Sequence, residues 1–284
     1  MDPVRGGHEV IRFIALDVDG TLLDSQWRVP EANRDAIRRA TDRGIEVALV
    51  TGRRFDFARP VIDAIDAPLT LIVSGGAIVK AHNGETLARH LLPAATARIV
   101  VEGTAAFREA TALVFDRPRS AQVVHERLDL SDPHRRSYFD RNRDFIVESI
   151  PLEAALTEDP IQVMYSGTVL RMRELVDTVR ALAVGGEVAI AVTEYESRDF
   201  SLVDVNRGGC TKGATLAEWV ASRGLTSGEV MAIGDNFNDR EMLEFAGLPV
   251  VMGNAVEELK QRGWHVTLGH DEAGVAAAID RFAL

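Results

Sequence analysis

Residues 13–23 have the sequence FIALDVDGTLL, in which an apolar run stops at two aspartates, Asp17 and Asp19. Gly20 follows them and can adopt turn conformations that other residues avoid. In α/β proteins, ligands bind at the carboxyl ends of parallel strands. We therefore expect a strand that places the carboxylate of Asp17 in an open site. A strand that simply ends in a polar turn fits residues 17–20 equally well.

The rest of the first third alternates strand and helix patterns. Residues 30–43 are expected to form a helix, with Pro30 in its first turn and Gly44 at its end. Strands are expected at residues 10–16, 46–50 and 69–73. Because residues 47–50 show no polar alternation, this strand is expected to be covered on both faces, as in a parallel sheet.

The same alternation returns near the C-terminus. Helices are expected at residues 212–222, 239–245, 255–262 and 272–282, and strands at residues 230–233, 250–252 and 266–268. Strands that alternate with helices imply right-handed crossovers. The sequence therefore predicts an α/β fold with a parallel sheet, built from residues 1–85 and 207–284.

Residues 86–206 have a different pattern. Short segments in which apolar and polar residues alternate lie at residues 121–124, 161–165 and 188–192. A helical pattern lies among them, at residues 171–182. A polar tract at residues 129–144 is expected to be an exposed loop or a frayed helix rather than a binding loop. We interpret residues 86–206 as a second, α+β domain inserted into the first.

The composition narrows the class of partner. The chain has 284 residues, 46% of them hydrophobic, and a net charge of −11. This acidic balance disfavours general attraction to nucleic acid or to an anionic membrane. An anionic substrate would need local positive charge, from a metal ion and a lysine.

The single cysteine, Cys210, excludes an intrachain disulfide and favours a reducing, cytoplasmic compartment. Residues 1–9 lack the apolar core of a secretory signal and are expected to be a short disordered lead-in. No later segment is apolar and long enough to suggest a membrane span.

Polar groups follow four strand ends or helix starts. They are Asp17 with Asp19, Thr51-Gly52-Arg53, Lys212-Gly213, and the run from Gly234 to Asp239. If the strands are neighbours in one parallel sheet, these groups converge on a single crevice. Taken singly, each has a plainer interpretation: a strand end, a surface lysine, or a turn with a helix cap.

Together these groups fit phosphoryl transfer to an aspartate. Asp17 is expected to attack phosphorus, while Asp19 protonates the leaving oxygen and later activates water. The two aspartates and Asp235 offer oxygen ligands for Mg²⁺. Thr51 with the adjacent amide of Gly52, and the ammonium of Lys212, are expected to bind the phosphoryl oxygens.

These motifs resemble the four ordered motifs of the haloacid dehalogenase superfamily. The sequences MGNA at residues 252–255 and EAGV at residues 272–275 are similar to the C-terminal signature of its Cof-type phosphatases. The resemblance covers nearly the whole chain. It implies a Rossmann-like core with an α/β cap domain inserted between the second and third motifs.

The resemblance also implies a role for each motif residue. Asp17 would be the nucleophile and Asp19 the general acid and base. Mg²⁺ would be held by Asp17, the Asp19 backbone carbonyl and Asp235. Asn238 would lie beside the phosphoryl group, and Asp239 would support the metal site or Lys212.

One position departs from the Cof-type pattern. Members usually carry Asn-Gly-Ala after the third core strand, whereas this chain has Gly75-Gly76-Ala77. A side chain near the expected site is therefore missing, and the two glycines are expected to allow a close backbone approach.

The function expected from these observations is a Mg²⁺-dependent phosphatase of a small phosphorylated metabolite, such as a sugar phosphate, a nucleotide or a phosphorylated cofactor. A phosphotransferase or mutase would use the same aspartyl-phosphate, and a non-catalytic binding protein would use the same scaffold. The cap would select the leaving group. Its candidate contacts are Arg117, Arg119, His125, Arg135, Arg136 and Tyr165, for each of which a salt bridge or packing is the plainer role.

Overall fold

The computed structural model describes residues 10–118, 120–129, 131 and 133–284. They form two compact units. The first comprises the residues up to Val73, Val79–Glu85 and Lys212–Leu284, and the second comprises Ser74–Ile78 and Thr86–Thr211. The expected limits of the inserted domain, residues 86 and 206, stay a prediction. Among the described residues, no helix has the length and apolar character that a membrane crossing needs.

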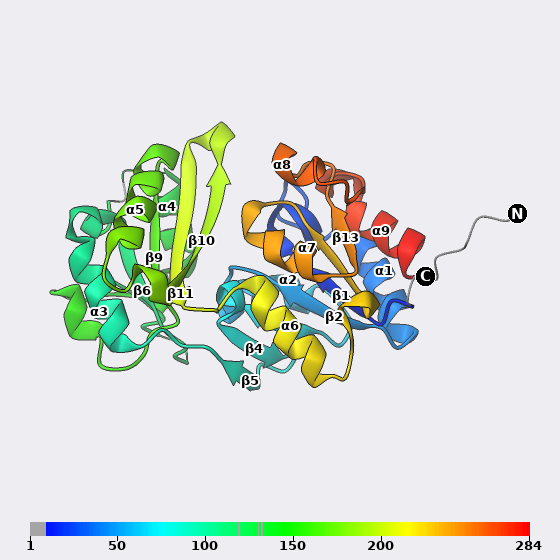
Figure 1. The fold of residues 1–284 in the computed structure, drawn as a ribbon, viewed down its shortest axis with the longest axis horizontal. Helices are drawn as coiled ribbons and strands as arrows, with labels where there is room; N and C mark the ends of the chain where they lie inside the picture. The colour runs from blue at the N-terminus through cyan, green and yellow to red at the C-terminus, as the bar shows by residue number, and fades with distance from the viewer. Residues whose placement is uncertain (1–9, 119, 130, 132) are drawn as a thin grey trace, which may run out of the picture. The chain divides into compact units, whose positions relative to one another are not determined.

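The first unit contains most of a sheet whose strand order is β14-β13-β12-β1-β2-β3-β4-β5, in which β5 belongs to the second unit (Figure 1). The strands are β1 (Phe13–Leu16), β2 (Glu46–Val50), β3 (Thr70–Val73), β4 (Ile78–Ala81), β5 (Thr86–Arg89), β12 (Val230–Gly234), β13 (Leu248–Val251) and β14 (His265–Val266). All neighbours from β14 to β3 pair in parallel. The expected α/β fold with a parallel sheet is therefore confirmed.

The chain order of the strands reverses at β1. From β1 it continues to β2 and β3 on one side, whereas β12 and β13 lie on the other. Right-handed crossovers then place helices on both faces of the sheet, and a crevice opens at the carboxyl ends of the strands where the order reverses. Asp17, the residue after β1, stands at that point.

Two helix pairs accompany this sheet: α1 packs beside α9, and α6 packs beside α7 (Figure 1). The helices of this unit are α1 (Glu31–Asp42), α2 (Phe55–Asp63), α6 (Lys212–Ser222), α7 (Arg240–Phe245), α8 (Glu257–Lys260) and α9 (Gly274–Phe282). Asn33 on the buried face of α1 donates to the Leu22 carbonyl and accepts from the Ala276 amide. This side chain joins the segment after Asp19 to α9.

The second unit has a mainly antiparallel sheet with strand order β10-β11-β9-β6-β7-β8. Its strands are β6 (Thr111–Val114), β7 (Val123–His125), β8 (Ile146–Glu148), β9 (Gln162–Gly167), β10 (Val188–Tyr195) and β11 (Phe200–Arg207). Its helices are α3 (Ala94–Gly103), α4 (Pro133–Asn142) and α5 (Val169–Ala181). Helices α3 and α5 pack on β9 and close an apolar core that includes Tyr165 and Phe115. The expected α+β pattern is present in this unit.

Several expected boundaries differ from the structure for local reasons. The first strand begins at Phe13 rather than Val10, which is exposed. The last helix begins at Gly274 because Ala273 has left-handed backbone, with φ of 54°. The helix expected at residues 255–262 is only the short α8, because Val256 is extended. Residues 1–9 lie outside the described residues.

The polar tract at residues 129–144 is not wholly exposed. Its described residues include α4, on which Arg135 is buried and donates from Nε to Ser166 Oγ at 3.0 Å. The expectation of a solvated excursion is therefore wrong for Arg135, which attaches α4 to β9.

Candidate functional site

The backbone around Asp17 is fixed at the carboxyl end of β1. The Asp17 amide donates to the Ile233 carbonyl of β12 at 3.0 Å, and the residue is 4% exposed. Gly20 has φ of 84°, and a Cβ atom there would lie 2.3 Å from Asp235 Oδ2. Glycine is therefore required at this position both by the turn and by the close approach of Asp235.

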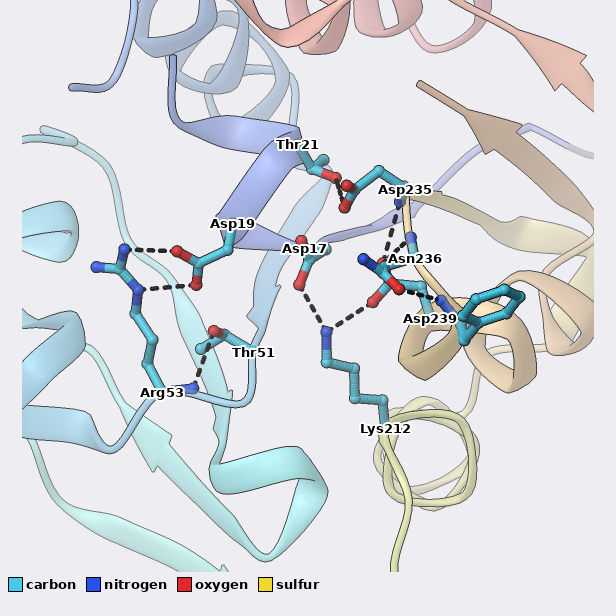
Figure 2. Close-up of polar contacts among 10 residues, drawn as sticks. Asp17, Asp19, Thr21, Thr51, Arg53, Lys212, Asp235, Asn236 and Asp239 are labelled. Atoms are coloured by element: carbon cyan, nitrogen blue, oxygen red, sulfur yellow. Dashed lines mark hydrogen bonds and ion pairs between the residues drawn. The ribbon is translucent and has the colours of Figure 1, made fainter. Parts of the chain in front are cut away.

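Lys212 is the first residue of α6, and its ammonium bridges two carboxylates (Figure 2). Nζ donates to Asp17 Oδ1 and to Asp239 Oδ1, each at 2.6 Å. The Lys212 side chain is 2% exposed. An unpaired charge at that depth would be costly, so these contacts are needed to keep the ammonium there. The surface-lysine interpretation is wrong.

Asp239 organises the turn after β12. Its second oxygen, Oδ2, accepts hydrogen bonds from the amides of Asp235 at 3.0 Å and Asn236 at 3.1 Å. Asp235 Oδ1 in turn accepts from Thr21 Oγ1 at 3.2 Å. Asp239 therefore holds Lys212 with one oxygen and shapes the backbone that presents Asp235 with the other.

Asp17, Asp235 and Asp239 form a buried group that fits a cation. One carboxylate oxygen from each lies within 4.8 Å of the others. A donor set made only of oxygen suits a hard cation such as Mg²⁺. Three carboxylates also outnumber the single Lys212 ammonium, so a divalent ion would neutralise the excess negative charge. The carboxylate of Asp19 is not in this group.

Burial and mutual repulsion perturb these groups. Burial, and then the negative charge of Asp239, raise the pKa of Asp17 to about 7. Burial, followed by the charges of Asp17 and Asp239, also raises the pKa of Asp235 well above its usual range. Burial alone would lower the pKa of Lys212, but the two adjoining carboxylates hold it above its ordinary value. Lys212 therefore stays charged, and protons compete for the carboxylates.

The carboxylate of Asp19 points away from Asp17 and toward Arg53 (Figure 2). Arg53 Nε donates to Asp19 Oδ2 at 2.8 Å, and Nη2 donates to Oδ1 at 2.6 Å. This two-point pairing fixes the orientation of the carboxylate. Arg53 belongs to the motif Thr51-Gly52-Arg53, but no role was predicted for it. Its guanidinium is the one charged group of that motif and could have suggested an ion pair with a site carboxylate.

Thr51, Gly52 and Asn238 are the other residues expected to bind the phosphoryl group. Thr51 is 1% exposed at the end of β2, and its Oγ1 accepts from the Arg53 amide at 3.1 Å. Gly52 is exposed and Asn238 is partly buried. The phosphate contacts expected for Thr51, Gly52 and Asn238 stay predictions.

The Ser74-Gly75-Gly76 segment after β3 has positive φ angles of 52°, 68° and 108°. A Cβ atom at Gly75 would lie 3.6 Å from Asn206 Nδ2, which is an ordinary contact. Left-handed backbone rather than crowding by neighbouring atoms therefore accounts for glycine at position 75, and the close backbone approach expected at Gly75 and Gly76 stays a prediction.

Several residues that were expected to contact the leaving group have structural partners within the second unit. Tyr165 is fully buried, and its hydroxyl lies 2.7 Å from Thr104 Oγ1. Arg117 pairs with Glu158 at 2.6 Å. His125 is buried with its ring edge toward Phe139. Arg136 is exposed, and Arg119 lies outside the described residues.

Comparison with known proteins identifies the sequence family. A family model described as haloacid dehalogenase-like hydrolase matches residues 14–279. Among curated proteins, a 5-amino-6-(5-phospho-D-ribitylamino)uracil phosphatase of Bacillus subtilis is 26% identical over 95% of this chain and 98% of its own length. A pyridoxal phosphate phosphatase of Escherichia coli is 28% identical over 88% of this chain and 91% of its own.

Solved structures agree in fold. BT1666 of Bacteroides thetaiotaomicron, from a study of phosphatases of the same superfamily, is 26% identical with a TM-score of 0.78. The match covers 98% of this chain and 97% of that one. The resemblance expected from the motifs is thus confirmed over nearly the full chain.

Proposed function

The chain belongs to the haloacid dehalogenase-like hydrolases, and on this basis we propose that it is a Mg²⁺-dependent phosphatase acting through an aspartyl-phosphate on Asp17. The observation that carries the proposal is the 2.6 Å hydrogen bond from Lys212 to Asp17 inside a group of buried carboxylates. Lys212 neutralises one oxygen of Asp17, and the other oxygen is available to attack phosphorus.

The proposed reaction has two displacements. An Asp17 oxygen bonds to phosphorus while the ester P–O bond breaks, and Asp19 gives its proton to the leaving oxygen. Asp19 then takes a proton from water, whose oxygen displaces Asp17 and releases inorganic phosphate. Thr51, Gly52 and Lys212 hold the phosphoryl oxygens, with Asn238 beside them. Because Arg53 binds both Asp19 oxygens, Asp19 must release at least one of these bonds to act.

The cation belongs to the same proposal. Asp17, Asp235 and the Asp19 backbone carbonyl would hold Mg²⁺, with Asp239 supporting them. When bound, the ion supplies positive charge that offsets repulsion between the carboxylate nucleophile and the phosphate. The oxygen-only donor set and its excess negative charge support this assignment.

The proposed substrate is a small phosphorylated metabolite: a sugar phosphate, a nucleotide or a phosphorylated cofactor. The relatives named above are phosphatases of such molecules, one a phosphoribityl-aminouracil and the other pyridoxal phosphate. Their identities to this chain, 26% and 28%, support the reaction class more than any particular substrate.

A phosphate-release screen over a metabolite panel tests the proposal. Wild-type protein is assayed with Mg²⁺ and again with excess EDTA, and the products are separated by chromatography. We expect inorganic phosphate from several esters, and only with Mg²⁺. A phosphorylated isomer without free phosphate would instead indicate a mutase, and no product from any ester would contradict catalysis.

A further inference from the structure

Trp27 occupies a turn that does not require a large side chain. Asp24 Oδ1 accepts hydrogen bonds from the amides of Gln26 and Arg28, each at 2.9 Å, and the Asp24 carbonyl accepts from the Trp27 amide at 2.9 Å. This closed turn holds Trp27 at φ of 62°. Bulky residues rarely adopt such backbone, whereas glycine does so without strain. The turn alone therefore does not account for tryptophan.

The indole of Trp27 is also poorly buried. The residue is 52% exposed, although tryptophan contributes to stability mainly by burying its large ring. A large, half-exposed aromatic side chain held at a backbone conformation that costs free energy suits a functional contact better than packing.

The Trp27 ring lies one side chain away from the proposed proton donor. The Arg53 guanidinium, which binds both oxygens of Asp19, lies 5.5 Å from the centre of the Trp27 ring and 4.9 Å from that of Phe57. All four residues belong to the first unit. A leaving group that receives its proton from Asp19 would lie on the side of Asp19 that faces Arg53, and the rings of Trp27 and Phe57 both lie near that guanidinium.

We propose that Trp27 is a specificity-determining residue whose half-exposed ring stacks on the leaving group, so that the enzyme favours phosphate esters whose alcohol carries a planar aromatic or heteroaromatic ring. The inference rests on the proposed function, because Asp19 as proton donor puts the leaving oxygen on this side. A planar ring would displace water from the indole face and gain the offset contact that aromatic pairs prefer. A polyol chain has no ring, so it neither displaces this water nor makes the offset aromatic contact.

Three esters with alkyl leaving groups isolate this effect: benzyl phosphate, cyclohexylmethyl phosphate and glycerol 3-phosphate. For Trp27→Gly, we expect kcat/KM to fall about tenfold on benzyl phosphate through a higher KM, less on the cyclohexyl ester, and under about twofold on glycerol 3-phosphate. Trp27→Phe is expected to keep most of the preference. Glycine accepts φ of 62°, so Trp27→Gly is expected to preserve the turn.

Trp264→Ala is the matched control. Arg262 lies 5.3 Å from the centre of that ring, so the same kind of contact is removed, next to edge strand β14 instead of Asp19. We expect it to change none of the three values. Equal losses on all three esters in Trp27→Gly, or no loss on benzyl phosphate, would overturn the inference while the proposed phosphatase stands.

A binding measurement separates the inference from the proposed function. If wild-type protein hydrolyses neither these three esters nor any ester of the metabolite panel, the phosphatase proposal fails, and tryptophan fluorescence is titrated with benzyl phosphate. Quenching that is present in wild type and absent in Trp27→Phe supports stacking on Trp27. The same quenching in both proteins, or none in either, contradicts it.

Discussion

The two compact units use their buried polar side chains differently. In the first, Lys212 connects Asp17 with Asp239, and these carboxylates approach Asp235. In the second, buried polar groups form separate contacts, such as Tyr165 with Thr104. The first arrangement concentrates unneutralised charge that a ligand can use, whereas the second serves packing. Convergence of buried ionisable groups, rather than burial alone, distinguishes a candidate site from a stabilised core.

The largest expected effect is on turnover in Asp17→Asn. The amide cannot form the aspartyl-phosphate, so kcat on p-nitrophenyl phosphate should fall on the order of 10⁴-fold or more, with the far-ultraviolet circular dichroism unchanged. Asp35→Asn on α1 makes the same chemical change at an exposed ion pair and should leave kcat as it is. Retained turnover in Asp17→Asn would exclude this nucleophile.

Asp235→Ala should mainly change the response to metal. Loss of a proposed ligand is expected to raise the Mg²⁺ concentration for half-maximal activity by about 100-fold or more. Mutation of a residue that only hydrogen-bonds to a metal ligand typically lowers metal affinity about 10–100-fold, and loss of the ligand itself should cost at least as much. Asp280→Ala, at an exposed aspartate of α9, is the control. Superimposable Mg²⁺ titrations for wild type and Asp235→Ala would remove this residue from the metal site.

The affinity for Mg²⁺ should depend on pH. Because the pKa of Asp17 is raised to about 7 without metal, Asp17 holds a proton below that pH, and the ion must displace it. We expect the apparent affinity to fall about tenfold or more per pH unit below about pH 7, because the raised pKa of Asp235 adds a second proton that competes with the ion. Calorimetry in buffers of different ionisation enthalpy measures the released protons; constant affinity from about pH 5.5 to 7.5 would contradict the coupling.

The smallest expected effect is in the second unit. Tyr165→Phe removes the hydroxyl that lies against Thr104 Oγ1, yet Thr104 keeps its bond to the Val100 carbonyl. We expect a loss of about 1 kcal/mol in the free energy of unfolding, measured by urea denaturation, with no change in the Mg²⁺ titration. A changed Mg²⁺ titration would show that a buried polar pair in this unit also serves the reaction.

The parallel sheet and the convergence of polar side chains at its strand ends could be predicted from the sequence, because both leave local patterns in it. Apolar runs mark buried strands, and Asp17, Lys212 and Asp235 each stand directly at a strand end or helix start. The bidentate hold of Arg53 on Asp19 could not be predicted in this way. It depends on the side-chain rotamers of two residues that are distant in the chain.

The second unit was harder to anticipate in detail. The polar composition around Arg135 indicated solvent, but a long guanidinium side chain reached Ser166 on β9 and became buried. In the first unit, the left-handed backbone at Ala273, which sets the start of α9, was also not predicted, because such backbone is usual for glycine rather than alanine. Such features arise from tertiary contacts that periodicity does not encode.

The position of β1 between β2 and β12 has a consequence for the order of synthesis. Asp17 is translated early, but the β12 carbonyl that fixes its amide, and the partners Lys212 and Asp235, are translated only after the whole second unit. A nascent or truncated polypeptide therefore carries the proposed nucleophile, Asp17, without Lys212 and without the other carboxylates proposed to hold the cation. We therefore expect the proposed activity to begin only after β12 has paired with β1.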